Sequence, residues 1–145
     1  MTTEFAKTSV TGRWDWLEGI KSQITKANFL KYFGVGEINA DSFSNTTSLI
    51  EISLPDTLTK INSWQFDGDT NLDHIDIPKG VLTIGRVAFR NLSSCRYIIL
   101  RPTRMITLED MLENGPFYGT SCPIYVPSSV LSTYQSDSNW STYSS

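Results

Sequence analysis

A short acidic segment, DGDTNLD, is the best candidate for cation binding in the chain. It places four ligand-type side chains at alternating positions: Asp67, Asp69, Asn71 and Asp73. This spacing is that of the first half of an EF-hand calcium loop, which also needs Gly at its sixth position and Glu at its twelfth. Leu72 and Pro78 stand at those positions. The segment therefore predicts at most weak cation binding to an acidic turn, and we expect no specific metal site.

Two cysteines and one histidine remain for nucleophilic chemistry. His74 is predicted on the outward side of a strand, and Cys95 is interpreted as a small buried hydrophobe. Cys122 precedes the segment IYVP, and a Cys–His pair would still need a third group to orient the base. The chain contains no GxSxG elbow, no glycine-rich phosphate loop and no HExxH motif. We therefore expect a non-catalytic protein without a cofactor, and an enzyme using Cys122 or His74 is only a third hypothesis.

Composition narrows the class of protein further. The chain has 145 residues, is 39% hydrophobic and carries a formal net charge of −3, which fits one globular domain and disfavours a nucleic-acid partner. No run approaches the roughly 18 apolar residues of a membrane span. The start lacks a basic head followed by an apolar run, so we expect no classical signal peptide and synthesis in the cytoplasm.

A period of 23 residues organises the middle of the chain. Apolar residues recur at this spacing in five columns, which indicates tandem repeats. The columns are Ile38, Ile61 and Ile84; Phe43, Phe66 and Phe89; Leu49, Leu72 and Cys95; Ile52, Ile75 and Ile98; and Leu54, Ile77 and Leu100.

Each repeat is predicted to form one coil of a solenoid. The alternation of Ile52 and Leu54 is typical of a short strand, which Pro55 ends because proline lacks an amide donor. The five-residue step from Ile38 to Phe43 favours a compact turn that inserts both side chains. Such a coil buries its apolar side only against its neighbours, so the coils are expected to stack around one continuous core.

The pattern I-x4-F-x5-L-x2-I-x-L/I-P resembles the BspA-like leucine-rich repeat. The copies LTKINSWQFDGDTNLDHIDIP and LTIGRVAFRNLSSCRYIIL match it closely, and FYGTSCPIYVPSSVLSTYQSDSNWSTYSS resembles the closing segment of that family. The resemblance covers residues 37–145. It implies an α/β solenoid with a C-terminal strand-helix cap at residues 122–145, and a role in recognition or adhesion on bacterial, protist or phage surfaces.

The first 36 residues fit the repeat poorly. The capping-box pair Asp15 and Glu18 predicts a helix over residues 15–27, with Trp16, Ile20, Ile24 and Ala27 on one face. Alternatively, Phe29 and Val35 belong to a degraded first coil. Residues 1–36 are interpreted as a helical cap or as a docking segment, and the residues that favour docking are the aromatic ones: Trp14, Trp16, Tyr32 and Phe33.

The C-terminal segment is predicted to close the other end of the stack. Residues 127–129 are expected to open a short helix that contains Val130, Leu131 and Tyr134, while Trp140 and Tyr143 fold back on the last coil. The insertion RMITLEDMLENGPFYGT lengthens that coil. Its apolar residues Leu108, Met111 and Leu112 suggest a helical turn, and Phe117 is expected to occupy the phenylalanine position.

Stacking in register would align outward residues into two rows on the strand face. The first row is Glu51, His74 and Tyr97, and the second is Ser53, Asp76 and Ile99. Acidic residues crowd the second coil and arginines crowd the third, which predicts ion pairs between neighbouring coils. The two rows are the predicted partner-binding residues, with an ordinary exposed strand face as the alternative.

Two non-catalytic functions follow. The first is a structural or attachment component of a larger assembly, such as a fibre, knob or decoration protein of a bacteriophage virion, in which residues 1–36 anchor the chain or form a homo-oligomer. The second is a stand-alone adhesin-like module of a bacterial surface. Either would bind a protein or glycan partner, on a virion or at an extracellular surface. Residues 1–36 carry a charge of +2 and the remainder −5, so the predicted docking segment also differs from the stack in charge.

Overall fold

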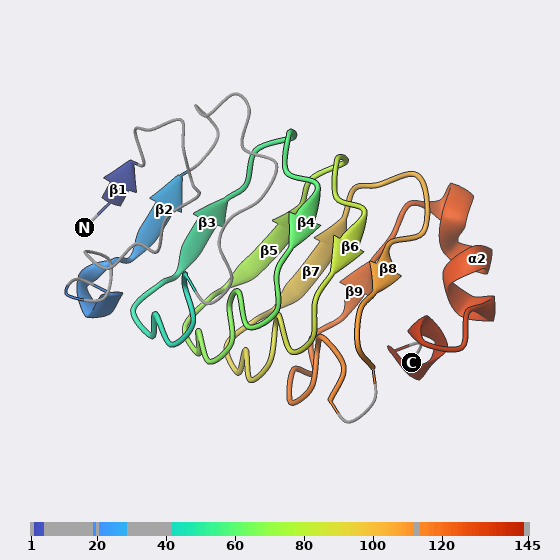
Figure 1. The fold of residues 1–145 in the computed structure, drawn as a ribbon. Helices are drawn as coiled ribbons and strands as arrows, with labels where there is room; N and C mark the ends of the chain where they lie inside the picture. Colours follow the sequence, from blue (N-terminus) through green and yellow to red (C-terminus); the bar gives the residue numbers. More distant parts are fainter. Residues whose placement is uncertain (1, 5–18, 20, 29–41, 112–113, 144–145) are drawn as a thin grey trace.

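The computed structural model describes residues 2–4, 19, 21–28, 42–111 and 114–143. These residues form a β-solenoid of parallel strands (Figure 1). One ribbon of strands consists of β1 (Thr2–Glu4), β2 (Lys26–Asn28), β3 (Glu51–Ser53), β5 (His74–Ile77), β7 (Tyr97–Leu100) and β9 (Ile124–Tyr125). A second, shorter ribbon consists of β4 (Lys60–Ile61), β6 (Thr83–Ile84) and β8 (Thr107–Leu108).

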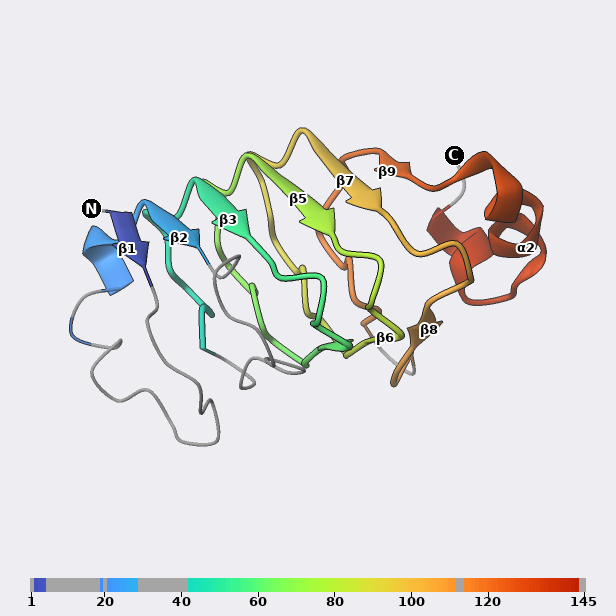
Figure 2. The same cartoon turned by 90° about the horizontal axis from the view of Figure 1, so that it is seen from above.

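The strands lie side by side along the solenoid. Strands β1, β2 and β3 form one hydrogen-bonded sheet, β5, β7 and β9 a second, and β4, β6 and β8 a third. Figure 2 shows the first two sheets following one another along one face of the molecule. Between them, the Asp73 amide donates to the Ile50 carbonyl at 3.0 Å. The face is therefore continuous across the junction of β3 and β5.

The repeat columns form the core. The described residues of the Ile, Phe and strand columns are all at most 6% exposed. Phe43, Phe66, Phe89 and Phe117 form a ladder with ring centroids 5.9, 5.6 and 5.4 Å apart. The prediction that Phe117 occupies the phenylalanine position is confirmed. Ile38 lies outside the described residues.

A left-handed backbone position follows each phenylalanine. Two residues after Phe43, Phe66, Phe89 and Phe117, the angle φ is +57° at Asn45, +75° at Gly68, +59° at Asn91 and +72° at Gly119. Asn and Gly tolerate this conformation best. A Cβ at Gly68 would lie 2.5 Å from Asn45 Oδ1, so glycine is also needed there for the close approach of the preceding coil.

The prediction of a helix over residues 15–27 is wrong for the part of that segment that the structure describes. Lys21–Gln23 form a 3₁₀ turn, η1, and residues 26–28 form strand β2. Ile24 and Ala27 are buried in the common core. Residues 15–18 and 20 lie outside the described part. The described N-terminal residues therefore form part of the stack rather than a helical cap.

The repeat itself explains why this segment looks helical. Strand β2 pairs with β3 so that Ala27 stands opposite Ile52, which is 25 residues later. Ile24 and Ala27 thus repeat the three-residue step of Leu49 and Ile52, and a step of three also suits a helix. The alternative of a degraded first coil is supported by this pairing, but the step of 23 that aligns Phe29 with Ile52 is wrong, because Ala27 stands opposite Ile52.

The C-terminal segment closes the stack as predicted. It contains η2 (Ser128–Val130), α2 (Leu131–Ser136) and η3 (Trp140–Tyr143). Val130, Tyr134 and Trp140 are buried, and the Trp140 indole Nε1 donates to the Ile106 carbonyl at 2.7 Å. Among the described residues, no helix has the length and apolar character that crossing a bilayer requires.

The prediction of a helical turn around Leu108 is wrong. Residues 107–108 form strand β8, which pairs with β6 so that Leu108 stands opposite Ile84. The insertion therefore continues the second ribbon of strands. Leu112 lies outside the described residues.

A carboxyl group is buried between two coils. Asp69 is fully buried, and its Oδ1 accepts a hydrogen bond of 2.7 Å from the Thr46 amide of the preceding coil. Within the described residues its Oδ2 has no hydrogen-bond partner. Burial raises the pKa of Asp69 to about 8, against the lowering effect of the Thr46 amide and the Lys21 charge.

Replacing Asp69 by asparagine should remove a pH dependence of folding. The pKa rises from 3.8 when exposed to about 8 in the folded chain, so the stability contributed by the protonated form is complete below pH 4 and is lost as the pH rises to about 8. Relative to Asp69→Asn, the free energy of unfolding of the wild type should fall by up to about 1.4 kcal/mol per pH unit in this window. Urea titrations of both proteins between pH 4 and 9 measure this difference. Parallel curves would contradict the assignment.

Candidate recognition surface

The outward side chains of the strand face align in rows. The register pairs His74 with Tyr97, Asp76 with Ile99, and Ile99 with Tyr125. Glu51 and Ser53 lie on β3, next to β5 along the same face (Figure 2). The residues of the two predicted rows are all partly buried, while Tyr125, which the rows did not include, is 57% exposed. Along β3, β5, β7 and β9, the face is therefore most exposed at its C-terminal end.

Aromatic rings run along this face. The rings of His74 and Tyr97 stack with centroids 5.1 Å apart. The next pair, Tyr97 and Tyr125, meets edge to face at 6.5 Å. The Arg96 guanidinium lies 5.6 Å from the centre of the Tyr97 ring. We call His74, Tyr97, Ile99 and Tyr125 the aromatic strip.

Ion pairs between neighbouring coils border the aromatic strip. Arg96 binds Asp73 through two hydrogen bonds of 2.6 Å, and Arg101 binds Asp76 at 2.8 and 2.7 Å. Lys26 Nζ lies 2.7 Å from a Glu51 carboxylate oxygen. The predicted pairing of charges between coils is confirmed. Because these pairs are exposed and screened by solvent, each contributes little to stability.

The charged members of the face are thus already paired within the chain. The hydrogen bonds from Arg96, and then the one from His74, hold the pKa of Asp73 well below its usual value. His74 Nδ1 lies 2.9 Å from Asp73 Oδ2, so this imidazole is held by a carboxylate and by a ring. Strands β3 and β5 also border a groove of about 460 Å³, whose lining includes Glu51, His74, Asp76 and Arg101.

The acidic segment does not converge on one point. The Asp67 carboxylate binds Arg90 at 2.7 Å, Asp69 faces the Thr46 amide, and Asp73 binds Arg96. The Asn71 side-chain amide donates to the Thr47 carbonyl at 2.8 Å. Within the described residues, no cluster of three or more His, Cys, Asp or Glu side chains is arranged to hold a metal ion.

The two cysteines, which lie far apart in the sequence, are in contact in the structure. The Sγ atoms of Cys95 and Cys122 are 3.1 Å apart, and both thiols are free. Cys95 packs against the core but is only partly buried, so its interpretation as a small buried hydrophobe holds in part. The contact falls outside the period of 23 because the next coil is longer, so Cys122 follows Cys95 by 27 residues. Cys122 therefore contacts Cys95, while His74 contacts Asp73 and Tyr97.

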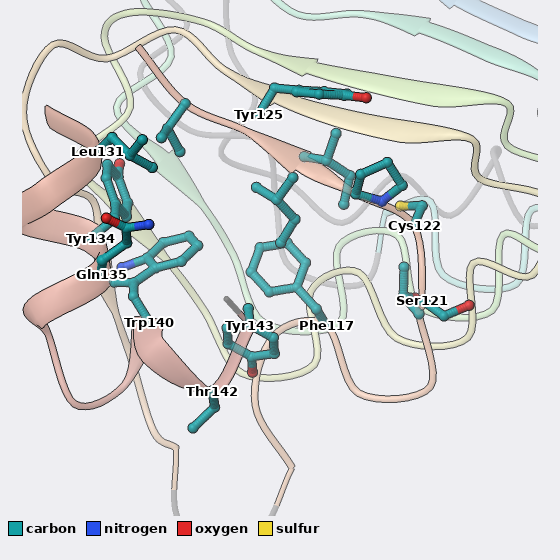
Figure 3. Close-up of a pocket in the computed structure, with 15 residues that line it drawn as sticks. Phe117, Ser121, Cys122, Tyr125, Leu131, Tyr134, Gln135, Trp140, Thr142 and Tyr143 are labelled. Atoms are coloured by element: carbon teal, nitrogen blue, oxygen red, sulfur yellow. The ribbon is translucent and has the colours of Figure 1, made fainter. Parts of the chain in front are cut away.

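A cavity of about 640 Å³ lies between the last coil and the C-terminal cap. Figure 3 shows Tyr125 and Cys122 on one side of it and Tyr134 and Trp140 on the other. No motif marks this cavity in the sequence. Its only signal is the high aromatic content of residues 117–143.

The proposed docking residues cannot be placed in this picture. Trp14, Trp16, Tyr32 and Phe33 all lie outside the described residues.

Comparison with known proteins supports the repeat architecture. The family model for the BspA type leucine-rich repeat region matches residues 21–133 with six copies. The match begins at residue 21, earlier than the resemblance over residues 37–145, and it includes β2, which pairs with β3 in the stack. No curated protein and no solved structure matches the chain. The matched region spans most of the chain, and the chain belongs to the BspA-type leucine-rich repeat family.

Proposed function

We propose that this chain is a non-catalytic recognition module that binds a protein partner through the aromatic strip on β5, β7 and β9. Leucine-rich repeats of this kind form protein-binding or adhesion-type modules. The single observation that carries the proposal is the exposed aromatic end of the strip, where Tyr125 is 57% exposed beside Tyr97.

The chemistry of the strip fits a protein interface. Tyrosine is among the residues that dominate binding energy at such interfaces, because its ring buries a large area at a low entropic cost. The strip is bordered by polar groups, as interface centres are bordered by a polar rim. Asp73 and Asp76 are already bound to Arg96 and Arg101, so the strip presents little unpaired charge.

The pairing of the charges around the aromatic strip predicts how binding of the partner depends on salt. A partner recognised by rings rather than by charges should bind with a weak dependence on salt, since screening acts mainly on unpaired exposed charges. Tyr125 also lines the cavity of about 640 Å³ under the C-terminal cap, which offers space for an apolar or aromatic side chain of the partner. A glycan would also stack on tyrosine rings, so the experiment must separate the two classes.

Selection of peptides from a random-sequence display library on the wild-type chain tests the proposal. Selected peptides should be rich in apolar and aromatic residues, and their affinity should change less than about threefold between low and physiological salt. Tyr97→Ser should weaken binding roughly tenfold or more. A glycan array is probed in parallel. Three results would each overturn the proposal. The chain could bind only on the glycan array, the library could yield no binding peptide, or the selected peptides could bind Tyr97→Ser as tightly as the wild type.

The setting of this activity is a further part of the proposal. One setting is an attachment component of a virion, anchored through the aromatic residues of positions 1–36, and the other is a stand-alone adhesin-like module of a bacterial surface. Light scattering on the full chain and on a Trp14→Ser, Trp16→Ser variant separates the two settings. An oligomer that the variant turns into a folded monomer favours an assembly component, whereas two monomers favour a free-standing module.

A further inference from the structure

We propose that Cys95 and Cys122 are a redox-active dithiol that forms an intramolecular disulfide by exchange with a low-molecular-weight disulfide, and that this bond fixes the last coil to the one before it. The contact is already made in the folded chain, where the two Sγ atoms are 3.1 Å apart. Both thiols are free.

The fold brings the two cysteines together without movement of the strands. Cys95 lies just before β7 and Cys122 just before β9, and these strands pair in parallel. The Ile98 amide donates to the Pro123 carbonyl at 2.9 Å, which holds the segment after Cys122 against β7. Bond formation therefore requires the sulfurs to move about 1 Å closer, toward the 2.05 Å of a disulfide.

A small disulfide has access to Cys122. This residue lines the cavity of about 640 Å³ beneath the C-terminal cap. Figure 3 shows it beside Ser121 and across the cavity from Trp140. Both chain neighbours, Ser121 and Pro123, are exposed.

The surroundings of the two thiols indicate which sulfur attacks the small disulfide and which one resolves the mixed disulfide. Contact with Cys95 lowers the pKa of the Cys122 thiol below its ordinary value, which favours its thiolate. The same contact, together with burial, raises the pKa of Cys95. Of the two thiols, Cys122 is the one that lines the cavity, and this access makes it the attacking sulfur and Cys95 the resolving one.

The exchange balances with one molecule of a disulfide R–S–S–R. The Cys122 thiolate attacks one of its sulfurs, which forms Cys122–S–S–R and releases R–S⁻. The Cys95 sulfur, on losing its proton to that thiolate, attacks Sγ of Cys122 and displaces the second R–S⁻, which takes up the proton that Cys122 had released. The two protein thiols are oxidised by two electrons, and R–S–S–R is reduced to two R–SH.

The bond would have a structural consequence. It closes a loop that contains β7, β8 and the insertion, and that ends at the strand on which the cap packs. Cross-linking two residues 27 positions apart restricts the unfolded chain and stabilises the folded one. Oxidation should therefore raise the midpoint of thermal unfolding by roughly 5–10 °C.

Oxidation of the purified, reduced full chain with glutathione disulfide tests the proposal. Peptide mapping under non-reducing conditions should identify a Cys95–Cys122 linkage in monomeric protein, and a reducing agent should reverse the shift in thermal midpoint. Disulfide-linked dimers, a product that keeps glutathione on one cysteine, or an unchanged thermal midpoint would overturn the proposal.

Two single variants test the assigned roles. Cys95→Ser should retain glutathione on Cys122, because the resolving sulfur is missing. Cys122→Ser should react at least roughly tenfold more slowly, because the remaining thiol, Cys95, does not line the cavity. Equal rates of reaction with glutathione disulfide for the two variants would contradict the assigned roles. Cys95→Ala and Cys122→Ala replace these variants if circular dichroism shows that serine unfolds the chain, and the peptide map of the wild type does not depend on either.

Discussion

Replacing Phe89 by alanine should lower the free energy of unfolding by about 3–5 kcal/mol. Phe89 is fully buried and its ring stacks on two others, at 5.6 Å from Phe66 and 5.4 Å from Phe117. The substitution opens a cavity in the middle of the ladder and interrupts contact between the inner coils and the last one. Urea unfolding followed by circular dichroism measures the loss.

Two further variants isolate the cause. Phe89→Leu keeps most of the apolar volume but removes both ring contacts, each worth about 0.5–1.5 kcal/mol, so its loss should be intermediate. Tyr118→Ala removes an aromatic ring that is 56% exposed and should change stability by less than about 0.5 kcal/mol. Equal losses for Phe89→Ala and Tyr118→Ala would contradict the ladder as the main support of the stack.

Replacing Trp140 by alanine should have the second largest effect. Its buried ring packs against Tyr134 at 4.8 Å and Phe117 at 5.8 Å, and its indole nitrogen donates to the Ile106 carbonyl. Removing the ring uncovers the end of the core and leaves that carbonyl without its partner. We expect a loss of about 3–5 kcal/mol in urea unfolding, and faster proteolysis within residues 127–143.

Matched variants again separate the contributions. Trp140→Phe keeps an aromatic ring and loses the hydrogen bond, so about 1–3 kcal/mol should be lost. Leu131→Ala lies in the same cap but is 43% exposed, and should have little effect. A cap that opens without lowering the stability of the coils would show that Trp140 does not protect the end of the stack.

The sequence predicts the regular part of this fold well because its columns follow a fixed period. A spacing of 23 residues carries each apolar side chain to the same place in the next coil, so Phe43, Phe66 and Phe89 stack in the structure. Charges at that spacing also meet: Asp67 pairs with Arg90, and Asp73 with Arg96. The core and these two ion pairs follow from the period alone, whereas Asp76 and Arg101 pair at a step of 25.

The sequence predicts the irregular coils poorly because their length changes. Ala27 stands opposite Ile52 at a step of 25, so the first described coil does not fit a period of 23. Its apolar residues are instead spaced as in a helix. The contact of Cys95 with Cys122 spans 27 residues for the same reason. A column at Asn45, Gly68, Asn91 and Gly119 was available in the sequence, and it locates the left-handed turn of each coil, including the longer one.

The candidate site is only partly predictable for a related reason. The two rows come directly from the period, since His74 and Tyr97 stand opposite each other. Tyr125 belongs to the longer coil, so it was missed although it is the most exposed ring of the strip. The cavity under the cap depends on how residues 128–143 pack on β9, which no periodic pattern determines.

The recognition proposal is tested most directly by two exposed tyrosines of the last coil. Tyr125 is 57% exposed on the strand face, and Tyr118 is 56% exposed in the turn after Phe117. Peptides selected on the wild-type chain are titrated against Tyr125→Ser and Tyr118→Ser by calorimetry. We predict that Tyr125→Ser weakens binding roughly tenfold or more while Tyr118→Ser leaves it within about twofold. Equal affinities, or a larger loss for Tyr118→Ser, would contradict the strand face as the recognition surface.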